Sequence, residues 1–130
     1  MQDIERVAKD VFDILRPGML EGVYQDVMTT GLVQLGHHCE QEFIMPITMY
    51  GTQTKRFVKP DIVVDKDIVV ELKACTSLTL THRQQLERYL NISGLIQGVL
   101  INFGPNLSIE HCLKKDDKLV WDTKQGSMFM

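Results

Sequence analysis

The sequence lacks several features that would place the protein in a specialised class. Its 130 residues include three cysteines and no Cys-x-x-Cys pair, so neither a zinc site of common spacing nor a disulfide framework is expected. Its apolar runs are far shorter than the roughly 20 residues that cross a bilayer. The N-terminal stretch carries acids and bases throughout, unlike a signal peptide. These absences predict a cytoplasmic protein that contacts no membrane.

Basic residues are not in excess either. The net charge is −3, which argues against a domain that coats nucleic acid by electrostatics alone. An enzyme with acidic metal ligands inside a locally basic cleft stays compatible with that charge. The hydrophobic fraction of 44% and the charged fraction of 24% are ordinary for one globular domain.

The residue pattern predicts a single α/β domain with a mixed sheet. Apolar spacing favours helices over 3–15, with Asp3 as N-cap, over 20–36, with Gly36 as stop, and over 80–93, with Thr81 as cap. Short segments rich in β-branched and aromatic residues favour strands within 39–51, 55–65, 67–74 and 96–104. Pro46 indicates an edge strand or a bulge. The end of the chain predicts a short strand over 107–113 and a frayed tail over 114–130.

Two carboxylates interrupt the most apolar of these strands. The segments 62–64 and 68–70 both read Ile-Val-Val, and a hairpin closed by residues 65–67 sets Asp61 opposite Glu71. Opposed side chains lie about 4.5–5.5 Å apart, where like charges repel. A divalent cation between them removes that repulsion, and Mg²⁺ and Mn²⁺ prefer carboxylate oxygens. Lys73, two residues after Glu71, shares its face.

Such a cluster suits the hydrolysis of a phosphodiester. A metal held by carboxylates binds the scissile phosphate and lowers the pKa of a bound water. A nearby lysine orients or deprotonates that water, or stabilises the charge that develops. The alternative is that these residues are solvated charges at strand ends, although the flanking valines do not alternate as solvated strands do.

The sequence also resembles a known family. Pro60-Asp61 followed by Glu71-Leu72-Lys73 matches the signature of the PD-(D/E)xK nuclease superfamily. The segments "GMLEGVY" (18–24), "QLERYL" (85–90) and "GVLINFG" (98–104) are similar to those of a group within it, the GxxExxY proteins. The resemblance runs from about residue 3 to residue 113. It implies one domain over 1–130 with a restriction-endonuclease-like αβββαβ core, a mixed central sheet and flanking helices.

The resemblance also implies roles for individual residues. Asp61 and Glu71 would be metal ligands, joined by Glu21 from the early helix and by the backbone carbonyl of Leu72. Lys73 would be the catalytic lysine, and Gln85 would position substrate or water. The cofactor would be Mg²⁺ or Mn²⁺ and the partner DNA or RNA. Small domains of this fold often pair, so a homodimer is also implied.

Each of these roles has a structural alternative. Apart from the resemblance, Glu21 is more typical of a surface helix charge than of a metal ligand, and Gln85 also suits a residue that caps or bridges secondary structure. His82 lies one helical turn before Gln85, which suits either the cleft or the surface. Lys55, Arg56 and Lys59 approach Asp61 along a strand, where they suit phosphate contacts or an ordinary solvated edge.

Three functions are therefore open. The first is a metal-dependent nuclease. The second is a nuclease-derived binding or regulatory module with little turnover. The third, an enzyme that acts on a smaller phosphorylated metabolite, has no support beyond the same cluster, because no glycine-rich phosphate loop is present.

Overall fold

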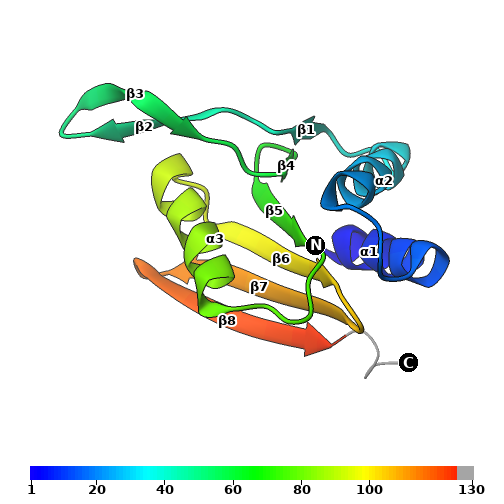
Figure 1. Ribbon diagram of the computed structural model, residues 1–130. Helices are drawn as coiled ribbons and strands as arrows, with labels where there is room; N and C mark the ends of the chain where they lie inside the picture. The colour runs from blue at the N-terminus through cyan, green and yellow to red at the C-terminus, as the bar shows by residue number, and fades with distance from the viewer. Residues whose placement is uncertain (126–130) are drawn as a thin grey trace.

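Two helices open the chain and cover one face of a central sheet (Figure 1). The computed structural model describes residues 1–125, with α1 over Gln2–Leu15 and α2 over Glu21–Gln34. The two helices pack closely at Gly31, where an added Cβ would come within 2.7 Å of Val7 Cγ1. Asp3 is not the N-cap, because α1 already begins at Gln2 and Asp3 lies in its first turn.

The sheet has six strands in the order β1-β4-β5-β6-β7-β8. Their bounds are β1 Cys39–Gln41, β4 Ile62–Val64, β5 Ile68–Lys73, β6 Gln97–Phe103, β7 Leu107–Lys115 and β8 Lys118–Gln125. Strands β5 and β6 are parallel and all other neighbours antiparallel, so the predicted mixed sheet is confirmed. The β4–β5 hairpin pairs Ile62 with Val70 and Val64 with Ile68, which is the register expected from the two Ile-Val-Val segments.

Helix α3 (Leu80–Ser93) connects β5 to β6 and covers the opposite face of the sheet (Figure 1). Thr79 caps it, accepting a hydrogen bond from the His82 backbone, while the His82 side chain accepts one from the Thr79 backbone. Thr81 is therefore not the cap. Because helices cover both faces, consecutive residues of β4 and β5 are buried on alternate sides, which explains their uninterrupted valines.

The segment between β1 and β4 leaves the sheet. Strands β2 (Met45–Met49) and β3 (Thr52–Val58) pair only with each other among the described residues and project from the body (Figure 1). Their register shifts between Pro46 and Thr48, so the bulge expected at Pro46 is confirmed. We call residues 43–60 the arm.

The C-terminal segment is ordered as far as the structure describes it. A turn at Asp116 and Asp117, both with positive φ, returns the chain from β7 into β8. Trp121 of β8 donates a hydrogen bond to Glu87 of α3 at 2.8 Å. The predicted frayed tail is thus wrong for residues 114–125, and the rest of that prediction falls on 126–130, outside the described residues.

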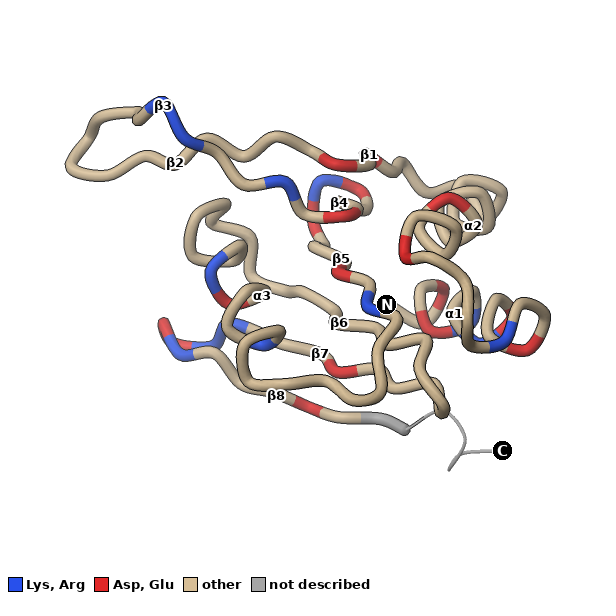
Figure 2. The backbone as a smooth tube through the Cα atoms, in the orientation of Figure 1, with Lys and Arg blue, Asp and Glu red and all other residues tan. Residues whose placement is uncertain are grey.

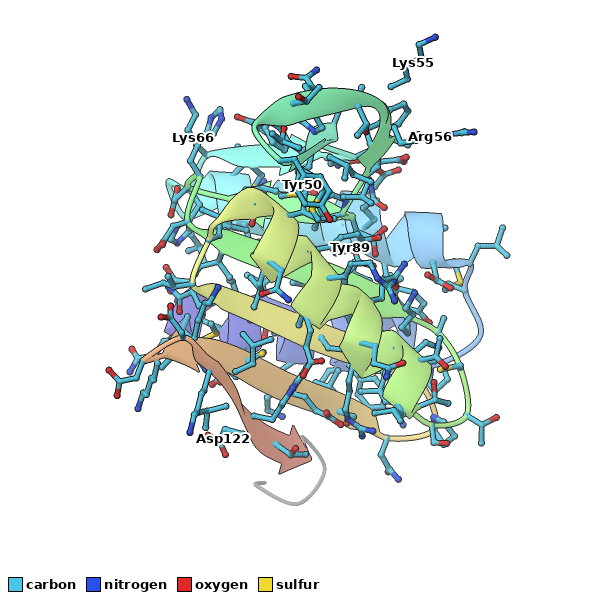
Figure 3. All side chains as sticks on the ribbon, turned by 90° about the vertical axis from the view of Figure 1, so that its left-hand side faces the viewer. Tyr50, Lys55, Arg56, Lys66, Tyr89 and Asp122 are labelled. Carbon is cyan, nitrogen blue, oxygen red and sulfur yellow. The ribbon has the colours of Figure 1, made fainter. Side chains whose placement is uncertain are left out.

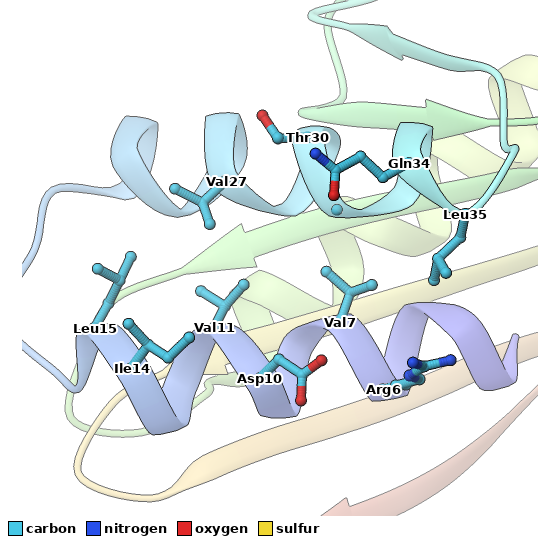
Figure 4. A pocket seen from close by; sticks show the side chains of 11 residues that line it. Arg6, Val7, Asp10, Val11, Ile14, Leu15, Val27, Thr30, Gln34 and Leu35 are labelled. Carbon is cyan, nitrogen blue, oxygen red and sulfur yellow. The ribbon is translucent and has the colours of Figure 1, made fainter.

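None of the helices within residues 1–125 is long and apolar enough to cross a membrane. A groove of about 360 Å³ separates α1 from α2 on their outer side (Figure 4). Its walls are mostly apolar, with Arg6 and Asp10 at one side. The groove lies apart from the paired carboxylates described next.

Candidate active site

Asp61 and Glu71 face each other across the start of the β4–β5 hairpin, on the side of the sheet that α3 covers. The Asp61 backbone N–H donates to Glu71 Oε1 at 2.6 Å, and the Leu72 backbone N–H donates to Asp61 Oδ2 at 2.8 Å. Each carboxylate thus accepts a hydrogen bond from the backbone of the opposite strand. These bonds fix both side chains and leave one oxygen of each for another partner.

The folded structure disfavours ionisation of both carboxyl groups. Glu71 is only 3% exposed, and this burial, followed by the charge of Asp61, raises its pKa to about 8. Burial also raises the pKa of Asp61, against the Leu72 hydrogen bond and the Lys73 charge, which lower it. Desolvation and like charge both favour the protonated form. A bound cation would favour the ionised form of both.

Lys73 is held beside this pair by a short chain of side chains. Its ammonium donates to Gln85 Oε1 at 3.0 Å and lies 4.0 Å from Glu71 Oε2. Gln85 Nε2 in turn donates to the Tyr89 hydroxyl at 3.0 Å. Burial raises the pKa of Tyr89 to about 12, so the hydroxyl keeps its proton. The chain directs the ammonium towards the carboxylates.

The two remaining metal-ligand candidates, Glu21 and Leu72, differ in exposure and in position relative to the carboxylate pair. Glu21 begins α2 and is exposed; its charge raises the pKa of both Asp61 and Glu71, but it is not grouped with them. Within residues 1–125, no three His, Cys, Asp or Glu side chains come together as a ready metal site. Leu72 is buried, and its N–H, as described above, serves Asp61.

Charged positions gather around this centre. In Figure 2, acidic positions occur on the connection into β4, on β5 and at the start of α2. His82 lies close enough that burial and the Lys73 ammonium lower its pKa, although its Nδ1 is engaged in capping α3. Lys59 is 3.7 Å from Glu42, and Glu42 donates its N–H to the Asp61 carbonyl. Lys55 and Arg56 lie farther out on the arm.

Two residues of this region were not expected to support the site. Tyr89 follows Gln85 by four residues, a spacing that places two side chains next to each other on a helix, and this is the signal that could have identified it. Asn102 clasps the segment after Lys73, accepting from the Cys75 N–H and donating to the Cys75 carbonyl, both at 3.0 Å. An amide inside the apolar run of β6 is the signal that could have identified it.

The sequence was compared with models of known protein families. The family model of the PD-(D/E)XK nuclease superfamily matches residues 1–114. The chain belongs to the PD-(D/E)XK nuclease superfamily. That assignment agrees with the mixed six-stranded sheet and the three helices of this α/β domain.

Other comparisons add little. Among solved structures, the crystal structure of SSO0001 is similar at 20% identity with a TM-score of 0.46, over 80% of this chain. This chain spans about half, 52%, of the length of that one. A comparison with curated proteins gives no match.

Proposed function

We propose that this protein is a divalent-metal-dependent nuclease that hydrolyses phosphodiester bonds of DNA or RNA. The observation that carries the proposal is the buried pair of Asp61 and Glu71 beside the ammonium of Lys73. Burial raises the pKa of both carboxyls, and the charge of Asp61 raises that of Glu71 further, so their ionised forms are unfavourable without a cation. A nuclease site requires that arrangement, and membership of the superfamily agrees with it.

The residues fit a divalent cation. Each carboxylate has one oxygen on a backbone N–H, so Asp61 and Glu71 would hold the ion with their second oxygens, together with the Leu72 carbonyl. Mg²⁺ is often bound by only one or two carboxylates, with water and substrate phosphate as its other ligands. Glu21, whose charge acts on both carboxyls, would contribute through a water molecule. The cation, Mg²⁺ or Mn²⁺, would supply charge neutralisation at the phosphate and a more acidic bound water.

The protein's own groups would do the rest. Lys73 would stabilise negative charge on the phosphate oxygens, and its proximity to Glu71 would let it orient the attacking water. Gln85 would be a positioning residue, because it accepts a hydrogen bond from Lys73 and is itself fixed by Tyr89. The Gln85 hydrogen bond and the nearby Glu71 carboxylate would hold the ammonium at the reaction centre.

A second candidate is a nucleic-acid-binding module of this fold with little turnover. It is favoured by the separation of Glu21 from the carboxylate pair, since no third acidic ligand is grouped there within the described residues. Assignment to the GxxExxY group, location in the cytoplasm and a homodimer stay predictions.

The experiment that tests the proposal combines metal binding with cleavage. Isothermal titration of Mg²⁺ and Mn²⁺ is run on the wild type, Asp61→Asn and Glu71→Gln, and cleavage is screened on single- and double-stranded DNA and RNA. We expect metal-dependent cleavage that falls about 10²–10⁴-fold in Lys73→Met. Lys66→Met, an exposed lysine in the β4–β5 turn, is the matched control and should retain activity. Absence of cleavage with every substrate and both metals would favour the binding module.

A further inference from the structure

The arm concentrates positive charge in an acidic protein. Residues 43–60 contain Lys55, Arg56 and Lys59 and no Asp or Glu, so the arm carries +3 while the chain as a whole carries −3. The other residues together therefore carry −6. In Figure 2 the basic positions of the arm follow one strand from β3 towards β4. A surface of this kind attracts a polyanion that the rest of the molecule repels.

The tip of the arm carries an aromatic residue, Tyr50, in a backbone conformation that is unfavourable for it. Tyr50 and Gly51 form the two-residue turn between β2 and β3, with φ of 53° and 71°. Such a turn favours Asn, Asp or Gly, and a bulky residue with positive φ is an outlier. The Tyr50 side chain is 97% exposed, so burial within this chain does not offset the strain. Strain kept at an exposed position points to a function there.

The arm is connected directly to the candidate site. Only Lys59 and Pro60 separate β3 from Asp61, and Lys59 pairs with Glu42, whose charge also acts on Asp61. In Figure 3 the Lys55 side chain points outward from the arm, away from the body, and the Arg56 side chain points to one side of the arm. A strand of nucleic acid seated at the carboxylates and continuing along β3 would meet these cations in turn.

We propose that the arm is a gripping element for single-stranded nucleic acid, in which Lys55 and Arg56 bind backbone phosphates and Tyr50 stacks on an unpaired base. The inference rests on the proposed function for the choice of partner. An aromatic platform combined with backbone-tracking cations is how proteins bind single strands without reading sequence. A paired base offers no free face to Tyr50, so the substrate contains at least one unpaired segment.

The test measures binding without cleavage. Fluorescence anisotropy with a labelled single-stranded oligonucleotide and a blunt duplex of the same sequence, as DNA and as RNA, is recorded in EDTA at several salt concentrations. Lys55→Gln/Arg56→Gln is expected to weaken single-strand binding and to reduce the slope of log K against log salt by about 1.4, or 0.7 for each lost phosphate contact. Lys115→Gln/Lys118→Gln, at the exposed β7–β8 turn, changes the net charge equally and should leave that slope unchanged.

Tyr50 is tested by a substitution that suits the turn. Asn is favoured where Tyr50 stands, so Tyr50→Asn should be at least as stable as the wild type in thermal denaturation, and lost binding cannot then reflect misfolding. We expect this variant to bind single strands about tenfold more weakly and the duplex almost unchanged. Tyr50→Phe, which keeps the ring, should bind like the wild type.

Three results would overturn the inference: no binding of any nucleic acid, equal losses in the arm and control variants, or equal losses of single strand and duplex in Tyr50→Asn. The outcome for the arm is separable from that for the proposed function. If cleavage depends on Lys73 but the arm variants bind like the wild type, only the proposed role of the arm is rejected. Binding that depends on the arm, with no cleavage under any condition, would support the arm and reject the nuclease.

Discussion

Glu71 makes the stability of the protein depend on pH in an unusual direction. A carboxyl whose pKa rises from 4.5 to about 8 on folding binds more protons in the native than in the unfolded state. Stability must then fall as the pH rises from 4.5 through 8. In EDTA, we expect the free energy of unfolding from urea titrations to decrease by a few kcal/mol over that interval.

The matched variant for this prediction is Glu71→Gln, whose amide oxygen still accepts the Asp61 N–H but cannot ionise. Its unfolding free energy should exceed that of the wild type at pH 8 and vary much less with pH. A wild type whose stability rises between pH 5 and 8 would show that Glu71 is ionised without penalty.

Gln85 offers a test of positioning as distinct from chemistry. Because Gln85 accepts a hydrogen bond from the Lys73 ammonium and so acts through it, Gln85→Leu should lower kcat about tenfold and leave KM nearly unchanged. Tyr89→Phe removes only the hydroxyl that fixes Gln85 and should lower kcat less. Steady-state cleavage assays provide both constants. A rise in KM alone would mean that Gln85 contacts the substrate instead.

The sequence was most informative where the relevant contacts are local. Asp61 and Glu71 could be placed opposite each other because two identical Ile-Val-Val segments surround a three-residue turn, which fixes the register. The position of Glu21 relative to that pair could not be predicted, since it depends on how α2 packs against the sheet. The contact between Lys73 and Gln85 likewise depends on the docking of α3, which no local pattern determines.

Among the elements, the first helix is tied to the central hairpin by one imidazole. His37 Nε2 lies 2.7 Å from Asp3 Oδ2 of α1, and Nδ1 lies 2.6 Å from Asp65 Oδ2 in the β4–β5 turn. Hydrogen bonds to Asp3 and then Asp65 raise the pKa of His37, and the bond with His37 lowers that of Asp65. The bridge therefore stabilises the fold at mildly acidic pH, below 6.5 for His37 and above 3.8 for Asp65.

His37→Gln should accordingly destabilise the protein by about 1 kcal/mol near pH 5.5 and by less near pH 9, after His37 loses its proton. Chemical denaturation at the two pH values measures the difference. His38→Gln is the control, because His38 is mostly exposed and its ring hydrogen-bonds to Glu40, outside the bridge between Asp3 and Asp65. A loss that is equal at both pH values would assign the bridge a purely geometric role.

Four strands could not be predicted individually from the sequence, for physical reasons. The β2–β3 pair and β1 were merged with their neighbours into longer strands, because β-propensity does not report which strand a segment pairs with. Strand β8 was missed because its residues are largely charged or exposed and its turn consists of two aspartates. Strand β8 is instead stabilised by tertiary contacts, namely its pairing with β7 and the hydrogen bond from Trp121 to α3.

At the scale of the whole molecule, β8 forms one edge of the sheet and should be essential for stability. Deleting residues 116–130 removes the Trp121 contact with Glu87 and exposes β7 as a new edge. We expect a loss of at least about 2 kcal/mol and a tendency to aggregate. Thermal unfolding and light scattering measure both effects. Deletion of 126–130 alone, which keeps β8 intact, is the control; equal effects of the two deletions would contradict this role.

The Glu71 and Asp61 carboxylates accept hydrogen bonds from the backbone N–H groups of Asp61 and Leu72, and this affects how a catalytically inactive variant should be made. Alanine at either position removes a rung of the central hairpin along with the charge, so an inactive alanine variant would confuse lost chemistry with a loosened scaffold. A trap for capturing cellular targets is better built at Lys73, whose ammonium contacts side chains only in the described structure. Isosteric amides at 61 and 71 would serve as its partners in the same pull-down.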